Sequence, residues 1–81
     1  MYGEPAMPTV KDFGRFKIRI YFDDHGEPHF HIIAADFAAK VSIETLELIA
    51  GDAPSRVLKQ ARDWADANRT QLRDVWNRGN G

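Results

Sequence analysis

The three histidines of this 81-residue chain all lie within seven positions, inside the segment of residues 23–31. His29 and His31 are two positions apart, so on a β-strand their imidazoles project from the same face, with Cα atoms about 6.6 Å apart. Imidazoles at this spacing can share one metal ion, or can move protons near neutral pH. The cluster is therefore the first candidate for a functional site.

A metal site would need a third ligand, which His25 or Asp24 could supply from the preceding turn. A set of three histidines, or of two histidines and a carboxylate, suits Zn²⁺ or another first-row transition metal. Lys40 is expected opposite His31, where its charge would repel a cation and lower histidine pKa values. We therefore expect no cofactor, with Zn²⁺ or a similar metal as the alternative.

Strands must position these histidines, and four runs show the alternation typical of strands: residues 15–22, 29–34, 37–43 and 46–49. Short polar breaks between them predict a three- or four-stranded antiparallel β-meander. One face is apolar and should receive the helices. It comprises Phe16, Ile18, Ile20, Phe30, Ile32, Phe37 and Val41.

The parity of side chains predicts which residues stand opposite each other, since directly opposed residues in an antiparallel pair share a face. The short loops place His31 opposite Lys40 and His29 opposite Ser42, while Tyr21 faces either histidine. The second face should therefore collect polar and cationic side chains: Lys17, Arg19, Tyr21, His29, His31, Lys40 and Ser42.

Such a face favours a second chemistry, the binding or metal-independent cleavage of RNA. Lys17, Arg19 and Lys40 would neutralise phosphates. The predicted catalytic residues are His29 and His31 as proton-transfer groups and Tyr21 as a positioning or stacking group. In the structural alternative, Asp24 and the histidines merely hydrogen-bond across the hairpin and hold its turn.

The C-terminal third of the chain has the period of a helix, from Pro54 to Arg78. An unbroken helix there would be about 37 Å long, longer than the sheet, so we expect a break near Asn68. Asp52 or Ala53 should cap its start. Trp64 and Trp76 are expected as core anchors. A basic stripe beside the apolar arc is expected to be a solvated face: Lys59, Arg62, Arg69 and Arg73.

The composition predicts one α+β domain over residues 7–81, preceded by a flexible extension, residues 1–6, with Met7 as a second candidate start. The absence of cysteine excludes disulfides and thiolate ligands, and favours a cytoplasmic location. The chain has no run of about 20 apolar residues, the length that a bilayer-spanning helix needs, so no membrane partner is expected. Because so small a core is marginal, a homodimer is an alternative to a monomer.

Several short motifs are shared with a known family, most specifically Pro-His-Phe-His at residues 28–31. The others lie at residues 7–10, 17–22, 24–25, 43–45, 64–65 and 76. On these the chain resembles the small bacterial proteins called the domain of unknown function 4160 family. It departs from the family pattern at Glu27, where a proline is frequent, and at Leu46, where a glycine is common.

The resemblance brings no established activity, but it implies a stand-alone gene beside one for another small protein, as in toxin–antitoxin modules. We therefore expect a small cytoplasmic module of this type that acts on or binds RNA. The alternatives are a non-catalytic protein-interaction or regulatory module, with a small protein encoded nearby as partner, and a metal-binding protein.

Overall fold

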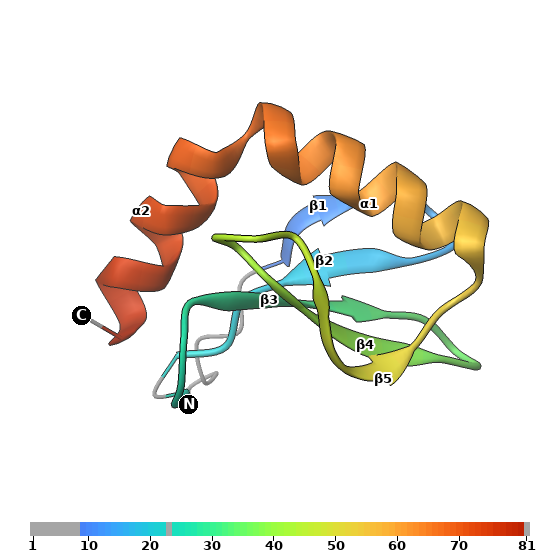
Figure 1. The fold of residues 1–81 in the computed structure, drawn as a ribbon, viewed down its shortest axis with the longest axis horizontal. Helices are drawn as coiled ribbons and strands as arrows, with labels where there is room; N and C mark the ends of the chain where they lie inside the picture. The colour runs from blue at the N-terminus through green and yellow to red at the C-terminus, as the bar shows by residue number, and fades with distance from the viewer. Residues whose placement is uncertain (1–8, 23, 81) are drawn as a thin grey trace, which may run out of the picture.

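The computed structural model describes residues 9–22 and 24–80, so the expected extension at residues 1–6 lies outside the described part. It contains five strands and two helices (Figure 1): β1 (Thr9–Asp12), β2 (Lys17–Arg19), β3 (His29–Ile33), β4 (Ala38–Ser42), β5 (Leu48–Asp52), α1 (Ser55–Ala67) and α2 (Arg69–Asn80). The predicted α+β meander with C-terminal helices is confirmed. The predicted count of three or four strands is wrong, because β1 adds a fifth strand that has no clear alternation of buried and exposed residues.

The strands form one antiparallel sheet in chain order, β1-β2-β3-β4-β5. In its centre His29 lies opposite Ser42 and His31 opposite Lys40, as parity predicted. On the other side of β3, Arg19 lies opposite His31. The register therefore places a cationic residue on each side of His31.

Two residues with positive φ help β4 and β5 to pair, one in the turn between the strands and one on β5 itself. Leu46 has φ 63° in the turn, where the amide of Leu46 donates to the carbonyl of Ser42. A leucine thus adopts the left-handed conformation that glycine adopts more easily. Gly51 has φ 73° on β5, and a Cβ added there would overlap the backbone carbonyl of Ala38. The backbones of β4 and β5 approach closely there.

In the view of Figure 1, α1 lies above the sheet and α2 descends at its left end, and the core lies between the helices and the sheet. The expected apolar face is confirmed, except that Phe37 at its margin is only partly buried. Completely buried side chains such as Ile18 and Phe30 each contribute roughly 1.5–3 kcal/mol through removal of apolar surface from water.

The helical segment breaks at Asn68, as the length argument predicted. The Asn68 side chain donates to the carbonyl of Trp64, and its own carbonyl accepts from the amide of Leu72. The expected cap at Asp52 or Ala53 is wrong, because β5 continues to Asp52 and α1 begins after Pro54. The break turns α2 down past the end of the sheet, toward the β2–β3 connection (Figure 1).

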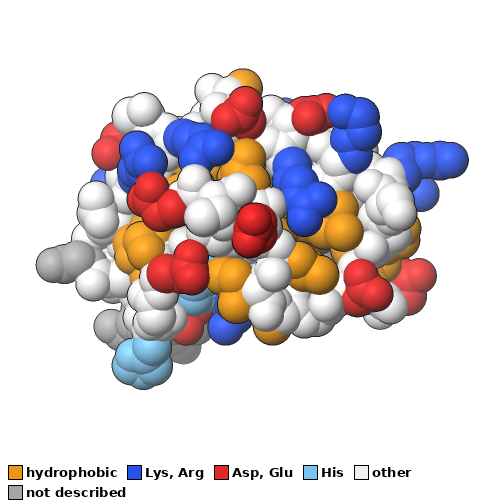
Figure 2. Space-filling model, in the orientation of Figure 1, with side chains coloured by type: hydrophobic (Ala, Val, Ile, Leu, Met, Phe, Trp, Pro, Cys, Tyr) orange, Lys and Arg blue, Asp and Glu red, His pale blue; other side chains and the backbone are white. Residues whose placement is uncertain are grey.

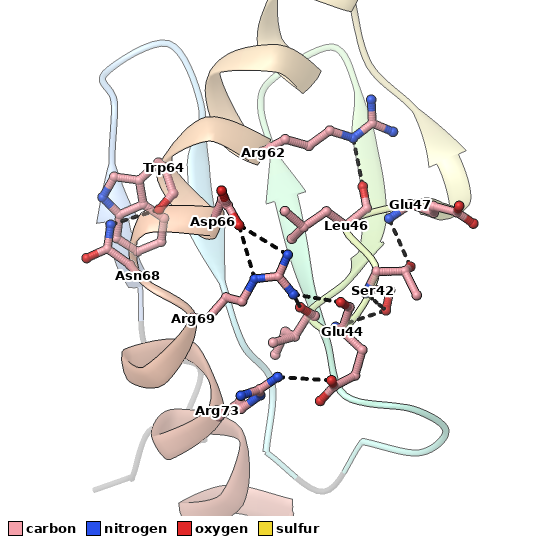
Figure 3. A network of polar contacts seen from close by, with 12 residues as sticks. Ser42, Glu44, Leu46, Glu47, Arg62, Trp64, Asp66, Asn68, Arg69 and Arg73 are labelled. Carbon is pink, nitrogen blue, oxygen red and sulfur yellow. Dashed lines mark hydrogen bonds and ion pairs between the residues drawn. The ribbon is translucent and has the colours of Figure 1, made fainter.

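Most of the basic stripe contacts the β4–β5 turn instead of remaining free in solvent (Figure 3). Arg69 donates to the carbonyls of Ile43 and Glu44, and Arg73 pairs with the Glu44 carboxylate at 3.0 Å. Arg62 donates to the carbonyl of Leu46. These bonds fasten both helices to the turn. Among the described residues, no helix is both long and apolar enough to cross a bilayer.

Candidate functional site

The candidate site lies where the β2–β3 connection meets the end of α2. Histidine side chains reach the surface there, at the lower left of the space-filling view (Figure 2). His29 begins β3 and His31 follows on the same strand, whereas Asp24 comes from the preceding loop. The local sequence explains this arrangement, because Gly26 has φ 89° and lets the loop turn back to β3.

Asp24 is the centre of the group. Its Oδ2 lies 2.8 Å from Nε2 of His29 and 3.3 Å from Nε2 of His31. These are the bonds that the structural alternative predicted. The other carboxylate oxygen accepts from the amide of His25 at 2.9 Å, and the amide of Asp24 donates to Oδ1 of Asn80. Both carboxylate oxygens of Asp24 and its backbone amide thus have hydrogen-bond partners.

These contacts determine the ionisation of Asp24. Partial burial disfavours the charged form, but the amide of His25 and the two imidazoles more than compensate. The pKa of Asp24 is therefore lowered from its ordinary value of 3.8 to about 2. The group carries a full negative charge beside both histidines at neutral pH.

The strand pattern predicted that His29 faces solvent. In the structure, however, only 1% of His29 is exposed. Its ring lies 4.9 Å from the indole of Trp76, which reaches it from α2. Nδ1 of His29 lies 2.8 Å from the carbonyl oxygen of Glu27, an acceptor, so Nδ1 carries a proton. His29 is therefore positioned and oriented, but it is screened from solvent.

His31 keeps access to the outside, with 15% of its side chain exposed. The ring of Tyr21 lies 4.2 Å from its imidazole, and Arg19 and Lys40 flank it on the neighbouring strands. Burial lowers the pKa of His31, the charges of His29 and Lys40 act in the same direction, and Asp24 opposes them. The neutral imidazole is therefore favoured.

The other predicted residues lie outside the group formed by Asp24, His29 and His31. His25 is exposed and its ring is not part of the cluster of converging ligand atoms. Lys17 is half-buried opposite Ile33, two residue pairs before Arg19 on β2. A shallow hollow beside His31 has small side chains and Lys40 along its walls. It is lined by His31, Ala38, Ala39, Lys40, Ala50 and Gly51.

Sequence reasoning missed two contributors from the far end of the chain. Trp76 was expected only as a core anchor, and it is buried as such, but it also covers His29. Asn80 was not singled out, although it bridges Asp24 and the carbonyl of Tyr21. The contact of Trp76 with His29 could not have been found, because the sequence predicts a break near Asn68 but not the direction in which α2 leaves it. The polar C-terminal segment contains no sequence pattern that would have pointed to Asn80.

The chain was compared with protein families, with curated proteins and with solved structures. No curated protein and no solved structure matches the chain. The family model described as domain of unknown function (DUF4160) matches residues 16–77, which include Tyr21, Asp24, His29, His31 and Trp76. Since this match covers most of the chain, the protein belongs to the domain of unknown function 4160 family.

Proposed function

We propose that this domain binds RNA through the outer sheet face, defined as the surface formed by Lys17, Arg19, Tyr21, His31 and Lys40. The observation that carries the proposal is the pairing of Arg19 and Lys40 with His31 on adjacent strands. Neighbouring strands are about 4.8 Å apart, so three groups that can be cationic follow one line across the sheet. Such a line suits a phosphodiester backbone.

The surroundings of His31 support an RNA ligand in two further ways. The hollow beside it is lined by alanines and Gly51, so a backbone or ribose can approach the sheet without displacing large side chains. The half-buried Tyr21 supplies an aromatic ring next to the same imidazole, and bases stack on such rings. The protein's net charge is −1, so binding would depend on this local arrangement.

Any proton transfer on this surface falls to His31, because His29 is buried. A neutral imidazole at pH 7 can accept a proton from a ribose hydroxyl, and the lowered pKa of His31 favours that state. This chemistry would suit the toxin of a toxin–antitoxin-type module. The partner would then be a small protein encoded nearby.

Binding can be tested by fluorescence anisotropy with a labelled single-stranded RNA, in excess chelator, between 50 and 200 mM salt. Affinity should fall steeply with salt, because each neutralised phosphate releases condensed counterions. Lys40→Ala should weaken binding and reduce the slope of log K against log salt by about 0.7. The matched control is Lys59→Ala, a lysine on α1 that pairs with Asp63. Equal losses in both variants, or no binding by the native chain at 50 mM salt, would contradict the proposal.

Cleavage is tested separately, with the same RNA at saturating protein. His31→Ala should reduce the rate by about 10²-fold or more and leave the anisotropy nearly unchanged, as expected for loss of a general base. His25→Ala should cleave normally, because that exposed histidine lies outside the group. If the native chain binds RNA without cleaving it, the domain is a binding module and His31 has no catalytic role.

A second candidate, a protein-interaction module, is favoured by the edge strand β5. All five of its residues are exposed, including Leu48 at 38% and Ile49 at 42%. Among residues 9–22 and 24–80, no strand pairs with the outer edge of β5, so a strand of a small partner protein could pair there. Ile49→Lys should abolish such a complex in size-exclusion chromatography. Concentration-dependent dimerisation of the chain alone would identify a second copy as the occupant instead.

A further inference from the structure

We propose that Asp24, His29 and His31 bind one divalent first-row transition metal ion, for which Zn²⁺ is the probe. This goes beyond RNA binding, for which the proposed test is carried out in excess chelator. Nε2 of each histidine and a carboxylate oxygen of Asp24 all lie within 4.8 Å of one another. Around a tetrahedral Zn²⁺, with bonds of about 2.0–2.2 Å, neighbouring ligand atoms lie about 3.3–3.6 Å apart. The separation of 3.3 Å between Asp24 and His31 fits that geometry, and the separation of 2.8 Å between Asp24 and His29 needs to widen by about half an ångström.

His29 supplies an independent observation, because both of its ring nitrogens face oxygen atoms that accept hydrogen bonds. Nδ1 donates to the carbonyl of Glu27, so Nε2 is the ring nitrogen directed at the group. Nε2 lies 2.8 Å from Oδ2 of Asp24. An ion placed at this point of the group would be bound by both atoms.

An ion held by Asp24 and His29 also lies within reach of His31. A backbone carbonyl on the far nitrogen is a common way of orienting a metal-bound histidine. Upon binding, the ion takes the Nε2 lone pairs and any proton held there is released to solvent. Two imidazoles and one carboxylate form a donor set for Zn²⁺ and similar ions, and leave positions open for water.

The ligands are also held in place before an ion arrives. The amide of Asp24 donates to Asn80 at 2.6 Å, and the amide of His25 holds the second carboxylate oxygen. This leaves Oδ2 directed at the histidines. The indole of Trp76 fixes the ring of His29 from the buried side. The exposed edge of His31 provides the route by which an ion enters.

The charged side chains near the group influence how tightly it should bind a metal ion. Arg19 and Lys40 lie next to His31 in the register and disfavour a cation, whereas the carboxylate of Asp24 favours one. Lys40→Ala should therefore strengthen metal binding by a few-fold. The same variant should weaken RNA binding, so the two proposals predict opposite effects of one substitution.

The test is calorimetric titration of the tag-free full chain with ZnCl₂, together with the melting temperature at each metal concentration. We expect one ion per chain and a rise in melting temperature, since the metal binds only the folded site. Asp24→Asn and His31→Ala should each weaken binding at least tenfold. His25→Ala, the matched control, should bind normally.

Two results would overturn the proposal. One is a native chain that shows neither heat nor a raised melting temperature at millimolar Zn²⁺. The other is binding that survives Asp24→Asn and His31→Ala, or that His25→Ala weakens as much as they do. The buried His29 is left unchanged in these variants because its removal would open a cavity in the fold.

Discussion

At the scale of single residues, Asp24 connects the two clustered histidines of the hairpin to the end of α2. Its carboxylate meets both clustered histidines, and its backbone is tied to α2 through Asn80. The spacing of the histidines and the presence of Asp24 in the turn predicted a candidate set of His25, His29, His31 and Asp24, of which the structure brings together all but His25. The burial of His29 could not be predicted, because Trp76 covers it from a helix whose direction depends on the break at Asn68.

The lowered pKa of Asp24 predicts how stability depends on pH. Its carboxylate stabilises the fold while ionised, by about 2 kcal/mol for a pKa of about 2 against 3.8. That contribution is present above about pH 4 and is lost as the pH falls toward 2. His31, with its lowered pKa, prefers to be neutral in the fold. Its protonation therefore reduces stability further as the pH falls below 6.5.

Urea unfolding at a series of pH values measures both effects. In Asp24→Asn the loss of stability between pH 4 and 2 should be smaller than in the native chain by about the 2 kcal/mol assigned to this carboxylate. Asp63→Asn, which removes an exposed carboxylate on α1, should retain the native pH dependence. Parallel curves for the native chain and Asp24→Asn would show that this carboxylate is not stabilised in the fold.

At the scale of the elements, alternation and parity predicted the central strands and their register, because a shift by one residue would expose the apolar face. The pairs of His31 with Lys40 and His29 with Ser42 are confirmed. The ends of the sheet were harder to predict. β1 has no clear alternation, and β5 continues through Gly51 and Asp52, which resembled the start of a helix in the sequence.

Gly51 offers a test of the close approach between β4 and β5. A Cβ there would overlap the carbonyl oxygen of Ala38, and the φ of 73° is unfavourable for alanine. Gly51→Ala should therefore lower the free energy of unfolding by about 2–4 kcal/mol. Gly26→Ala is the matched control. Its φ is 89°, but nothing lies within 4 Å of the added atom, so it should cost only about 1 kcal/mol. Equal costs would mean that the strands separate easily at this point.

At the scale of the whole molecule, the sheet divides two kinds of surface. Helices and core occupy one face, and the bonds from Arg62, Arg69 and Arg73 to the β4–β5 turn fasten that layer. The basic stripe is thus largely engaged in holding the fold together. The outer sheet face keeps its cationic residues around His31. We therefore expect the proposed RNA binding at the outer sheet face, and a structural role for the helical layer.

The most direct test of that assignment is an NMR titration of the ¹⁵N-labelled chain with a short single-stranded RNA, in chelator and at low salt. The account predicts that the largest shift changes fall on β3 and β4, at His31, Lys40 and their neighbours, with the amides of α1 nearly unchanged. Shift changes confined to α1 and α2, or none at millimolar RNA, would contradict the assignment of RNA binding to the outer sheet face.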